Sequence, residues 1–297
     1  MRCRTLAAAA VSPAQSSRYN AQMNEQTYAQ INLLPTAQSL AALCSPDAQD
    51  IDIRLVAETG STNADLLASV PHLHRPTLLW AGMQTAGKGR AGRTWHAAAG
   101  ATLTFSLAWK FALQAQALAG LSLAVGVIVA ETLASFGVDA RLKWPNDILR
   151  NGDKLAGILI ETALDKTDRQ AIWTIIGIGI NVAHAPDLSE QIGRAVADAP
   201  ELADQRARFI AALLDRFSLA LPLFEQQGFP AFAAAWNALD AYAGQQVNIL
   251  EQGKILAHGK AAGVDQSGCL LLATAQGRMA IVAGDVSLRV TEEYTED

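Results

Sequence analysis

The most constraining feature of this sequence is the glycine-rich, basic segment Ala81–Trp95, which lies between two strand-like runs. Glycine and positive charge are interleaved there, in the order Gly82, Gly87, Lys88, Gly89, Arg90, Gly92 and Arg93. Glycines let the backbone adopt positive φ and approach a ligand closely, while exposed amides and cationic side chains form an anion-binding concavity. The segment therefore predicts a phosphate-binding loop, although loops collect glycine and charge even when they are only solvated connections.

Two common phosphate-binding motifs do not account for this loop. The Walker motif needs Gly-Lys-Ser/Thr at the start of a helix, and the loop does not supply it. Gly87-x-Gly89-x-x-Gly92 matches the dinucleotide-binding pattern, but the next run, Thr102–Trp109, alternates and is rich in β-forming residues. The loop is therefore expected to connect strand to strand, without the helix N-terminus that a dinucleotide site requires.

Composition sets the broad class of the protein. A chain of 297 residues with 51% hydrophobic and 17% charged residues is long enough for one large and one small domain. The net charge of −5 argues against a protein built to coat nucleic acid, so any basic site must be local. Cys3, Cys44 and Cys269 are scattered, which indicates neither disulfides nor zinc and favours a reducing cytoplasm. No apolar run reaches the roughly 18 residues of a membrane span, so no membrane association is expected.

Residues 1–50 form an N-terminal extension that we expect to be partly disordered. The basic start and short apolar patch of Met1–Val11 faintly suggest a targeting peptide, but the patch is too short for a secretory core. Translation starting at Met23 is an alternative, with a short helix at Ala37–Leu43. No recognition helix can be drawn in this region, so DNA binding is not expected.

Apolar periodicity predicts alternating strands and helices in the central part of the chain. The predicted strands are Ile53–Ala57, Thr77–Gly82, Thr102–Trp109, Arg141–Trp144, Leu155–Ile160 and Trp173–Ile180. The predicted helices are Ala64–Val70, an amphipathic helix from Leu118 with Leu121, Val125, Ile128 and Phe136 on one face, a helix with the stripe Phe209, Leu213, Phe217, Leu221 and Phe224, and Phe232–Leu239. Pro222 is expected to kink or end the third of these helices.

The sequence changes character beyond Gly244. Short β-like runs separated by glycine-bearing turns follow at Val247–Leu250, Ile255–Gly263, Cys269–Leu272 and Met279–Val282. This pattern predicts a small β-barrel.

Three sets of polar residues beside these predicted elements are candidates for a functional site. Ser61, Thr62 and Asn63 precede a helix, where capping alone would explain them. Lys143, Asn146 and Asp147 suit a nucleotide triphosphate with Mg²⁺, although Asn146-Asp147 is equally a turn pair and Lys143 a surface charge. Lys154 opens an apolar strand, a position where a charge is expected to face a ligand. Gly177 and Gly179 thin the Trp173–Ile180 run so that a ligand can approach.

In this order, four segments together with the basic loop closely resemble the biotin protein ligases: Glu58-Thr-Gly-Ser-Thr-Asn63, Arg141-Leu-Lys-Trp-Pro-Asn-Asp-Ile148, Lys154-Leu-Ala-Gly-Ile-Leu-Ile-Glu161 and Gly177-Ile-Gly-Ile-Asn181. The resemblance runs from about Asp52 to Val290. It implies an α+β fold, with a class II synthetase-like catalytic domain at 51–242, a mixed sheet flanked by helices, and an SH3-like barrel at 243–297. It also implies a ligase of the type that lacks an N-terminal DNA-binding domain.

The resemblance assigns roles residue by residue. It implies Arg90, Lys143 and Lys154 as catalytic cations. It implies biotin contacts for Ser61, Thr62, Asn63, Gln84, Gly87, Lys88, Arg90, Lys154, Gly157 and Gly177. It implies nucleotide contacts for Arg90, Arg93, Trp95, Lys143, Asn146, Asp147, Asn181 and Arg289, with Mg²⁺ at Asp147. Lys88 departs from the family's commoner arginine and keeps the charge without the bidentate fork. Trp95 has packing, and Arg289 surface charge, as the alternative interpretation.

The implied reaction joins biotin and ATP into biotinyl-5′-AMP with release of pyrophosphate, then transfers biotin to one lysine of a biotin carboxyl carrier protein. The nearest alternative is a lipoate or octanoate ligase or transferase, which shares the fold. An alternative of another class is a biotin-responsive regulator that needs no catalysis. A monomer and a homodimer both remain open.

Overall fold

The computed structural model describes residues 34–97, 100–166, 168, 170–192, 195–251, 254–284 and 286–291. Met1, Met23 and Cys3, and with them the expectations for the targeting peptide and the alternative start, lie outside these residues. The last part of the predicted extension is folded, because α2 (Ala37–Ala41) places Leu40 in the core. Short 3₁₀ helices lie in the connections, at Pro46–Ala48, Val70–His72, Arg90–Gly92, Ala115–Leu118 and Pro200–Leu202.

A mixed seven-stranded sheet forms the centre of the molecule, in the order β1-β2-β3-β7-β6-β5-β4. Strands β1 and β2 are parallel and the other neighbouring pairs are antiparallel. The bounds are β1 Asp52–Thr59, β2 Thr77–Gln84, β3 Thr102–Phe111, β4 Arg141–Lys143, β5 Asp147–Arg150, β6 Asp153–Leu164 and β7 Ile172–Asn181. The predicted strands are confirmed, and the basic loop does connect strand β2 to strand β3.

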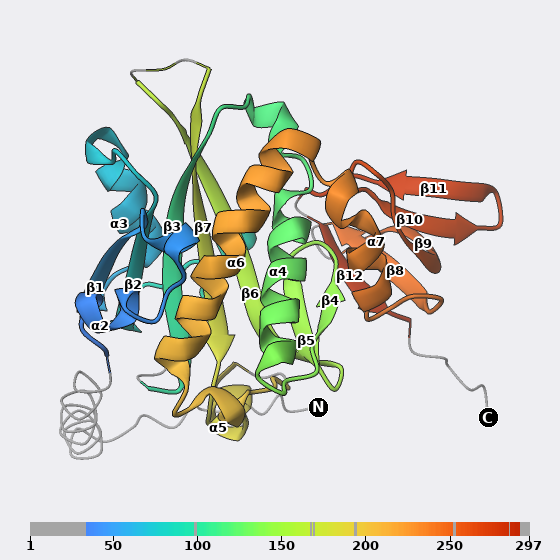
Figure 1. Ribbon diagram of the computed structural model, residues 1–297. Helices are drawn as coiled ribbons and strands as arrows, with labels where there is room; N and C mark the ends of the chain where they lie inside the picture. Colours follow the sequence, from blue (N-terminus) through green and yellow to red (C-terminus); the bar gives the residue numbers. More distant parts are fainter. Residues whose placement is uncertain are drawn as a thin grey trace, which may run out of the picture.

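Helices cover the two faces of this sheet unequally (Figure 1). One face carries α4 (Leu121–Ser135), α6 (Arg206–Gln227) and α7 (Pro230–Leu239) over the main core. The other face carries α3 (Thr62–Ser69), whose Leu66 packs against Leu79, Trp173 and Ile175. A further helix, α5 (Ala185–Ile192), follows β7. Helix α3 covers only one end of this sheet face. The sheet surface beyond the first turn of α3 is therefore left for a cavity.

Helix α4 differs from the prediction in two ways. It is buried nearly all round and not amphipathic, because the sheet lies on one side and α6 and α7 lie on the other, so Leu123, Val127 and Val129 are buried as well as the predicted face. The helical stretch Ala115–Ser135 is also long and apolar enough to cross a membrane, with a mean hydropathy of 2.0, so the expectation that no such run exists was wrong. In the fold its α4 part, Leu121–Ser135, is a core helix.

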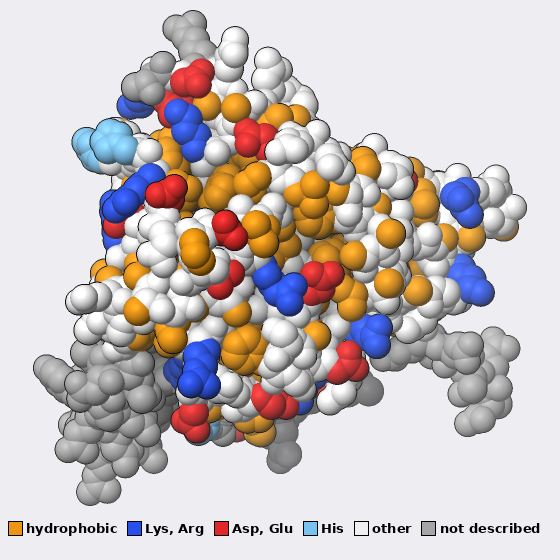
Figure 2. Space-filling model, in the orientation of Figure 1, with side chains coloured by type: hydrophobic (Ala, Val, Ile, Leu, Met, Phe, Trp, Pro, Cys, Tyr) orange, Lys and Arg blue, Asp and Glu red, His pale blue; other side chains and the backbone are white. Residues whose placement is uncertain are grey.

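Helix α6 carries the predicted stripe of buried residues, and it runs on past Pro222 to Gln227. Of the two expected effects of Pro222, ending the helix did not occur, and a kink there stays a prediction. Phe224, beyond the proline, still packs edge-on against Phe111 of β3, with ring centroids 6.1 Å apart. On the face of the molecule shown in Figure 2, hydrophobic side chains are interspersed with charged ones.

The C-terminal strands form a separate five-stranded antiparallel sheet, in the order β11-β10-β9-β8-β12. Its bounds are β8 Gln246–Glu251, β9 Lys254–Val264, β10 Leu270–Thr274, β11 Gly277–Ile281 and β12 Val286–Val290. Two side chains join it to the larger unit: Trp144 Nε1 donates to the Gly268 carbonyl (3.1 Å), and Asn237 Oδ1 accepts from the Val264 amide (2.8 Å). The small sheet is therefore docked against α7 and the turn that follows β4.

Two leucines on α6 test this packing. Leu213 is fully buried and Leu219 is 63% exposed on the same helix. We expect Leu213→Ala to lower the free energy of unfolding by about 2–5 kcal/mol, because it leaves a cavity in the core, and Leu219→Ala by less than about 0.5 kcal/mol. Urea denaturation measures both values, and equal losses would contradict the orientation of α6.

Candidate functional site

A cavity of about 630 Å³ opens on the α3 side of the central sheet. Its floor is made where glycines of neighbouring strands meet: Gly157 of β6 pairs with Gly179 of β7, and Gly177 pairs with Ser106 of β3. A Cβ atom at Gly177 would lie 2.2 Å from Asn63 Oδ1, and one at Gly179 would lie 2.3 Å from Trp95 Cε2. The glycines are therefore required so that these two side chains can rest on the sheet.

Almost every residue predicted for the site lines this one cavity: Ser61, Thr62, Asn63, Gln84, Lys88, Arg90, Arg93, Trp95, Lys143, Asn146, Asp147, Lys154, Gly157, Gly177, Asn181 and Arg289. The exception is Gly87, which is buried beneath the loop. A Cβ there would lie 2.5 Å from the Trp95 carbonyl oxygen, and the Trp95 amide donates to the Gly87 carbonyl (2.9 Å). Gly87 shapes the loop, and its contact with a ligand stays a prediction.

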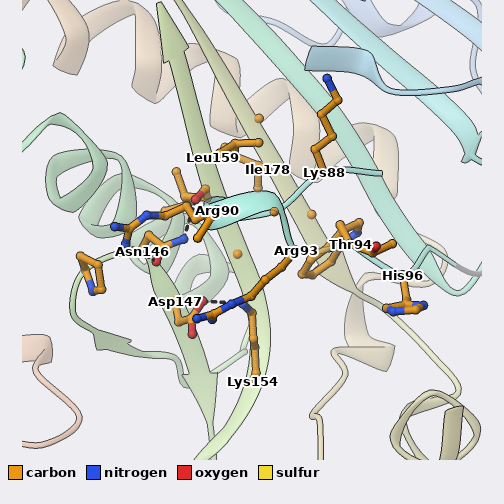
Figure 3. Close-up of a pocket in the computed structure, with 18 of the residues that line it drawn as sticks. Lys88, Arg90, Arg93, Thr94, His96, Asn146, Asp147, Lys154, Leu159 and Ile178 are labelled. Carbon is orange, nitrogen blue, oxygen red and sulfur yellow. Dashed lines mark hydrogen bonds and ion pairs between the residues drawn. The ribbon is translucent and has the colours of Figure 1, made fainter. Parts of the chain in front are cut away.

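Arg90 bridges the basic loop to two other parts of the chain. Its Nη1 donates to Asn146 Oδ1 (3.0 Å), and its Nη2 donates to the carbonyl of Gly284, between β11 and β12. Asn146 is itself fixed, because its Nδ2 donates to the Ile158 carbonyl (2.7 Å). Figure 3 shows Arg90 directed at Asn146, whereas Lys88 points away from this cluster. Arg90 therefore closes the loop over the cavity.

Lys154 and Asp147 form the second charged pair (Figure 3). Their Nζ and Oδ1 atoms are 2.5 Å apart, and both side chains remain about one-fifth exposed (20% and 21%). Lys154 Nζ also lies 5.7 Å from the centroid of the Trp95 ring, in cation–π geometry. The ammonium group is thus held at the cavity wall by a carboxylate and an aromatic face.

The third wall comes from the C-terminal sheet. Gly284, Ser287, Leu288 and Arg289 line the cavity there. Lys143 Nζ lies 5.8 Å from the ring centroid of Tyr242, at the start of the connection to this sheet. Burial raises the pKa of the Tyr242 phenol, and the nearby Arg289 acts in the opposite direction. Tyr242 therefore stays a neutral, polarisable group between Lys143 and Arg289.

The opposite end of the cavity is lined by the polar residues Ser61, Thr62, Asn63 and Gln84. Ser61 caps α3, since its hydroxyl accepts from the Ala64 amide (3.4 Å). Thr62 donates its backbone amide to Gln84 Oε1 (2.7 Å), and Asn63 is held over Gly177. Thr62 and Asn63 are almost completely buried. Such buried hydrogen-bonding groups are suited to a neutral polar ligand group.

Charge is strongly one-sided across the cavity. Its cations are Lys88, Arg90, Arg93, Lys143, Lys154 and Arg289, and Asp147 is the one carboxylate among the described lining residues. The buried Asn181 Oδ1 has no hydrogen-bond partner within the described structure, although Asn181 Nδ2 donates to the carbonyls of Lys154 and Ala197. The arrangement suits an elongated anion with a neutral polar group at one end.

Two family models match the chain. The biotin/lipoate A/B protein ligase family matches residues 55–181, and the biotin protein ligase C-terminal domain matches residues 242–289. The biotin–[acetyl-CoA-carboxylase] ligase of Paracoccus denitrificans is 35% identical over 240 residues, which cover 78% of this chain and 98% of that protein.

The chain belongs to the biotin protein ligase family. Another relative of this ligase, the bifunctional ligase/repressor BirA of Escherichia coli, is 34% identical over 236 residues, or 78% of this chain and 73% of BirA. Among solved structures, the biotin protein ligase of Aquifex aeolicus in complex with biotin and ATP superposes with a TM-score of 0.68 at 30% identity, covering 81% of this chain and 99% of that one. These matches confirm the predicted fold class of a mixed sheet with helices followed by a smaller β unit.

Several residues of this ligase site were not predicted from the sequence. Ser106 could have been found, because Thr102, Thr104 and Ser106 place polar groups on one face of an otherwise apolar buried strand. Gly284, which lines the cavity, and Tyr242, which contacts the lining residue Lys143, could not be predicted, because they lie in connections without periodicity. Their positions depend on contacts between distant parts of the chain.

The glycine floor can be tested without any ligand. We expect Gly179→Ala to displace Trp95 and open the basic loop, because the new methyl group has no space beside the indole. Trypsin cleavage after Lys88, Arg90 and Arg93 should then be about tenfold faster, since proteolysis follows the population of the open form. Gly60→Ala is the matched control, because a Cβ there meets nothing within 4 Å. Unchanged cleavage of the Gly179→Ala variant would contradict the docking of Trp95.

Proposed function

We propose that this protein is an ATP-dependent biotin protein ligase that forms biotinyl-5′-AMP and transfers biotin to a lysine of a carrier protein. One observation carries the proposal: Arg90, Lys143 and Lys154, which are far apart in sequence, line the same cavity as the Ser61–Asn63 turn. The cationic end suits the phosphates of ATP and a carboxylate, and the neutral end suits the ureido ring of biotin. Family membership supports the same activity.

In the first half-reaction, a carboxylate oxygen of biotin attacks the α-phosphorus of ATP. A P–O bond to the acyl oxygen forms, the bond to the bridging oxygen breaks, and pyrophosphate leaves with the electron pair. Arg90, Lys143 and Lys154 stabilise the negative charge that develops on the phosphoryl oxygens. Their hydrogen bonds and ring contacts hold these cations in place beforehand, so little reorganisation is needed during the reaction.

In the second half-reaction, a neutral lysine ε-amine of the acceptor attacks the acyl carbon of the mixed anhydride. The C–N bond forms, AMP leaves with the electrons of the acyl C–O bond, and the amine loses a proton to solvent or to AMP. The loop that Arg90 ties to Asn146 and Gly284 covers the adenylate, which limits its hydrolysis. We propose the biotin-carrying part of acetyl-CoA carboxylase as acceptor, because the Paracoccus relative is named for that substrate.

A magnesium ion belongs to this proposal only as a companion of ATP. Asp147 is the one carboxylate of the described cavity wall, and no cluster of three or more acidic, histidine or cysteine side chains occurs among the described residues. This donor set fits an ion bound mainly by substrate phosphates with one protein carboxylate, as is usual for Mg²⁺. Such an ion would neutralise part of the triphosphate charge beside Asp147.

Pyrophosphate exchange tests the function and separates it from lipoate ligation. We expect labelled pyrophosphate to enter ATP when biotin is added and not when lipoate is added, because the neutral end of the cavity offers paired polar groups that a dithiolane ring leaves unsatisfied. Mass analysis of a carrier domain should then show one added biotinyl group. Exchange that depends on lipoate would identify the alternative ligase, and binding of biotin with no exchange would favour a regulator.

Arg90 provides a test of the mechanism. We expect Arg90→Ala to slow adenylate synthesis on the order of 10²-fold and to let the intermediate escape, because one charge-stabilising group and the loop closure are lost together. Single-turnover synthesis and retention of biotinyl-5′-AMP measure both effects. Arg54→Ala, which removes an exposed arginine paired with Asp52 on β1, is the control. An Arg90→Ala enzyme with the rates of the control would rule out the assigned role.

A further inference from the structure

A row of hydrogen bonds crosses the neutral end of the cavity and ends at Glu161 on β6. Asn63 Nδ2 donates to Glu161 Oε2 (2.8 Å) and to the Leu159 carbonyl (3.3 Å). On its other side, Asn63 Oδ1 accepts from the Ser106 hydroxyl (2.6 Å). The row continues from Ser106 to the Thr62 hydroxyl (2.6 Å) and from Thr62 to Gln84 Oε1 (3.0 Å). Asn63 is 4% exposed and Ser106 is fully buried, so water does not compete within the row.

Once the Asn63 amide is oriented in this way, the hydrogens available fix the direction of each bond in this row. Ser106 has one hydroxyl hydrogen, which it gives to Asn63 Oδ1, so the short contact with Thr62 must be made by the Thr62 hydrogen. That hydrogen is shared with Gln84 Oε1, which also receives the Thr62 backbone amide (2.7 Å). The oxygen of Gln84 is thus held at Thr62, and its amide nitrogen lies towards Gly87.

The same side chains could also be connected in the reverse sense. If the Asn63 amide were rotated by half a turn, its nitrogen would donate to Ser106, Ser106 to Thr62, and Thr62 to Gln84. Every hydroxyl would still be satisfied, so Ser106 and Thr62 alone do not choose between the two directions. Glu161 does, because the rotated amide would place Asn63 Oδ1 against a carboxylate and against the Leu159 carbonyl, two groups that can only accept.

We propose that Glu161 is a positioning residue that sets the hydrogen-bonding polarity of the ligand pocket. It holds Asn63 so that both amide hydrogens point to β6 and Oδ1 lies over Gly177 in the cavity lining, where it accepts from Ser106 and has a second lone pair. The pocket wall over Gly177 therefore accepts hydrogen bonds and does not donate them. A ligand ring that brings N–H groups to this wall is bound, and a ring that brings only acceptors or sulfur is rejected.

This inference rests on the proposed function and refines its specificity. The ureido ring of biotin carries two N–H donors, whereas the dithiolane ring of lipoate carries none. Glu161 lies seven residues along β6 from Lys154, a separation of roughly 23 Å in a strand. Glu161 also lines a second hollow with Leu159 and with Lys88, Arg90 and Arg93 of the basic loop. Measuring kcat therefore separates an effect through Asn63 from an effect on these cations.

The experiment compares biotin with an analogue whose ureido ring is a cyclic carbonate, in which oxygen replaces both N–H groups. Wild-type protein should bind biotin on the order of 10²-fold or more tightly than the carbonate, because the carbonate brings hydrogen-bond acceptors to a pocket wall that only accepts. In Glu161→Gln the carboxamide can donate as well as accept, so only the longer bond to the Leu159 carbonyl (3.3 Å) still opposes rotation of Asn63. The affinity for biotin should fall about tenfold, and the preference over the carbonate should shrink by about tenfold. Calorimetry measures both affinities.

Two further measurements separate positioning from a general structural defect. The biotin-saturated rate of pyrophosphate exchange should change by less than about twofold in Glu161→Gln, so the loss appears in KM and not in kcat. Glu251→Gln, which makes the same charge change at an exposed residue of β8, should leave the preference for biotin over the carbonate unaltered. Both variants replace a carboxylate by an isosteric amide at a partly or fully exposed position, and their unfolding midpoints verify the fold.

Each result has one meaning. A reduced preference in Glu161→Gln with kcat retained supports the assignment. The same preference in wild type, Glu161→Gln and Glu251→Gln overturns it while leaving biotin ligation intact. Failure of the wild type to bind biotin at all would overturn the proposed function, and the inference with it.

Discussion

The structure depends on the absence of side chains at one spot of the central sheet. Gly177 and Gly179 of β7 lie where Asn63 and Trp95 descend onto the strand backbone. The same face of the sheet is covered by α3 further along, through a small apolar cluster around Leu66. One end of this sheet face is thus packed against α3, and the other end carries glycines in place of larger side chains. The functional cavity exists because β7 continues through this region with glycines, which leave space above the sheet.

Buried polar groups give the cavity its chemical asymmetry. Cations from three separate parts of the chain gather at one end, each held by a partner before any ligand arrives. Hydroxyl and amide groups gather at the other end in a nearly dry row. In a low-dielectric site both kinds of group act more strongly than they would in water, and an unpaired one is costly. Recognition of the ligand and stabilisation of its reaction are therefore separated in space along a single groove.

Much of the fold and of the candidate site could be predicted from the sequence, and each wrong or missing prediction has a physical cause. Strands such as Trp173–Ile180 were predicted because their apolar runs reflect burial, and the convergence of Arg90, Lys143 and Lys154 followed from the motif resemblance. The surroundings of α4 were mispredicted, because periodicity on one face does not reveal that α6 and α7 cover the rest. The hydrogen-bond row through Ser106 and Glu161 could not be predicted, because it depends on the register of β3, β7 and β6. The closure of the C-terminal sheet into a barrel stays a prediction.

The wall formed by Gly284 and Arg289 belongs to a sheet that shares no strand with the glycine floor. A molecule that fills the cavity from end to end must touch both sheets, so it adds a further connection to those that Trp144 and Asn237 already make between them. Occupancy would then stiffen the whole protein, and not only the loop above the ligand. The length of the ligand, as well as its chemistry, becomes a determinant of how firmly the two halves are held together.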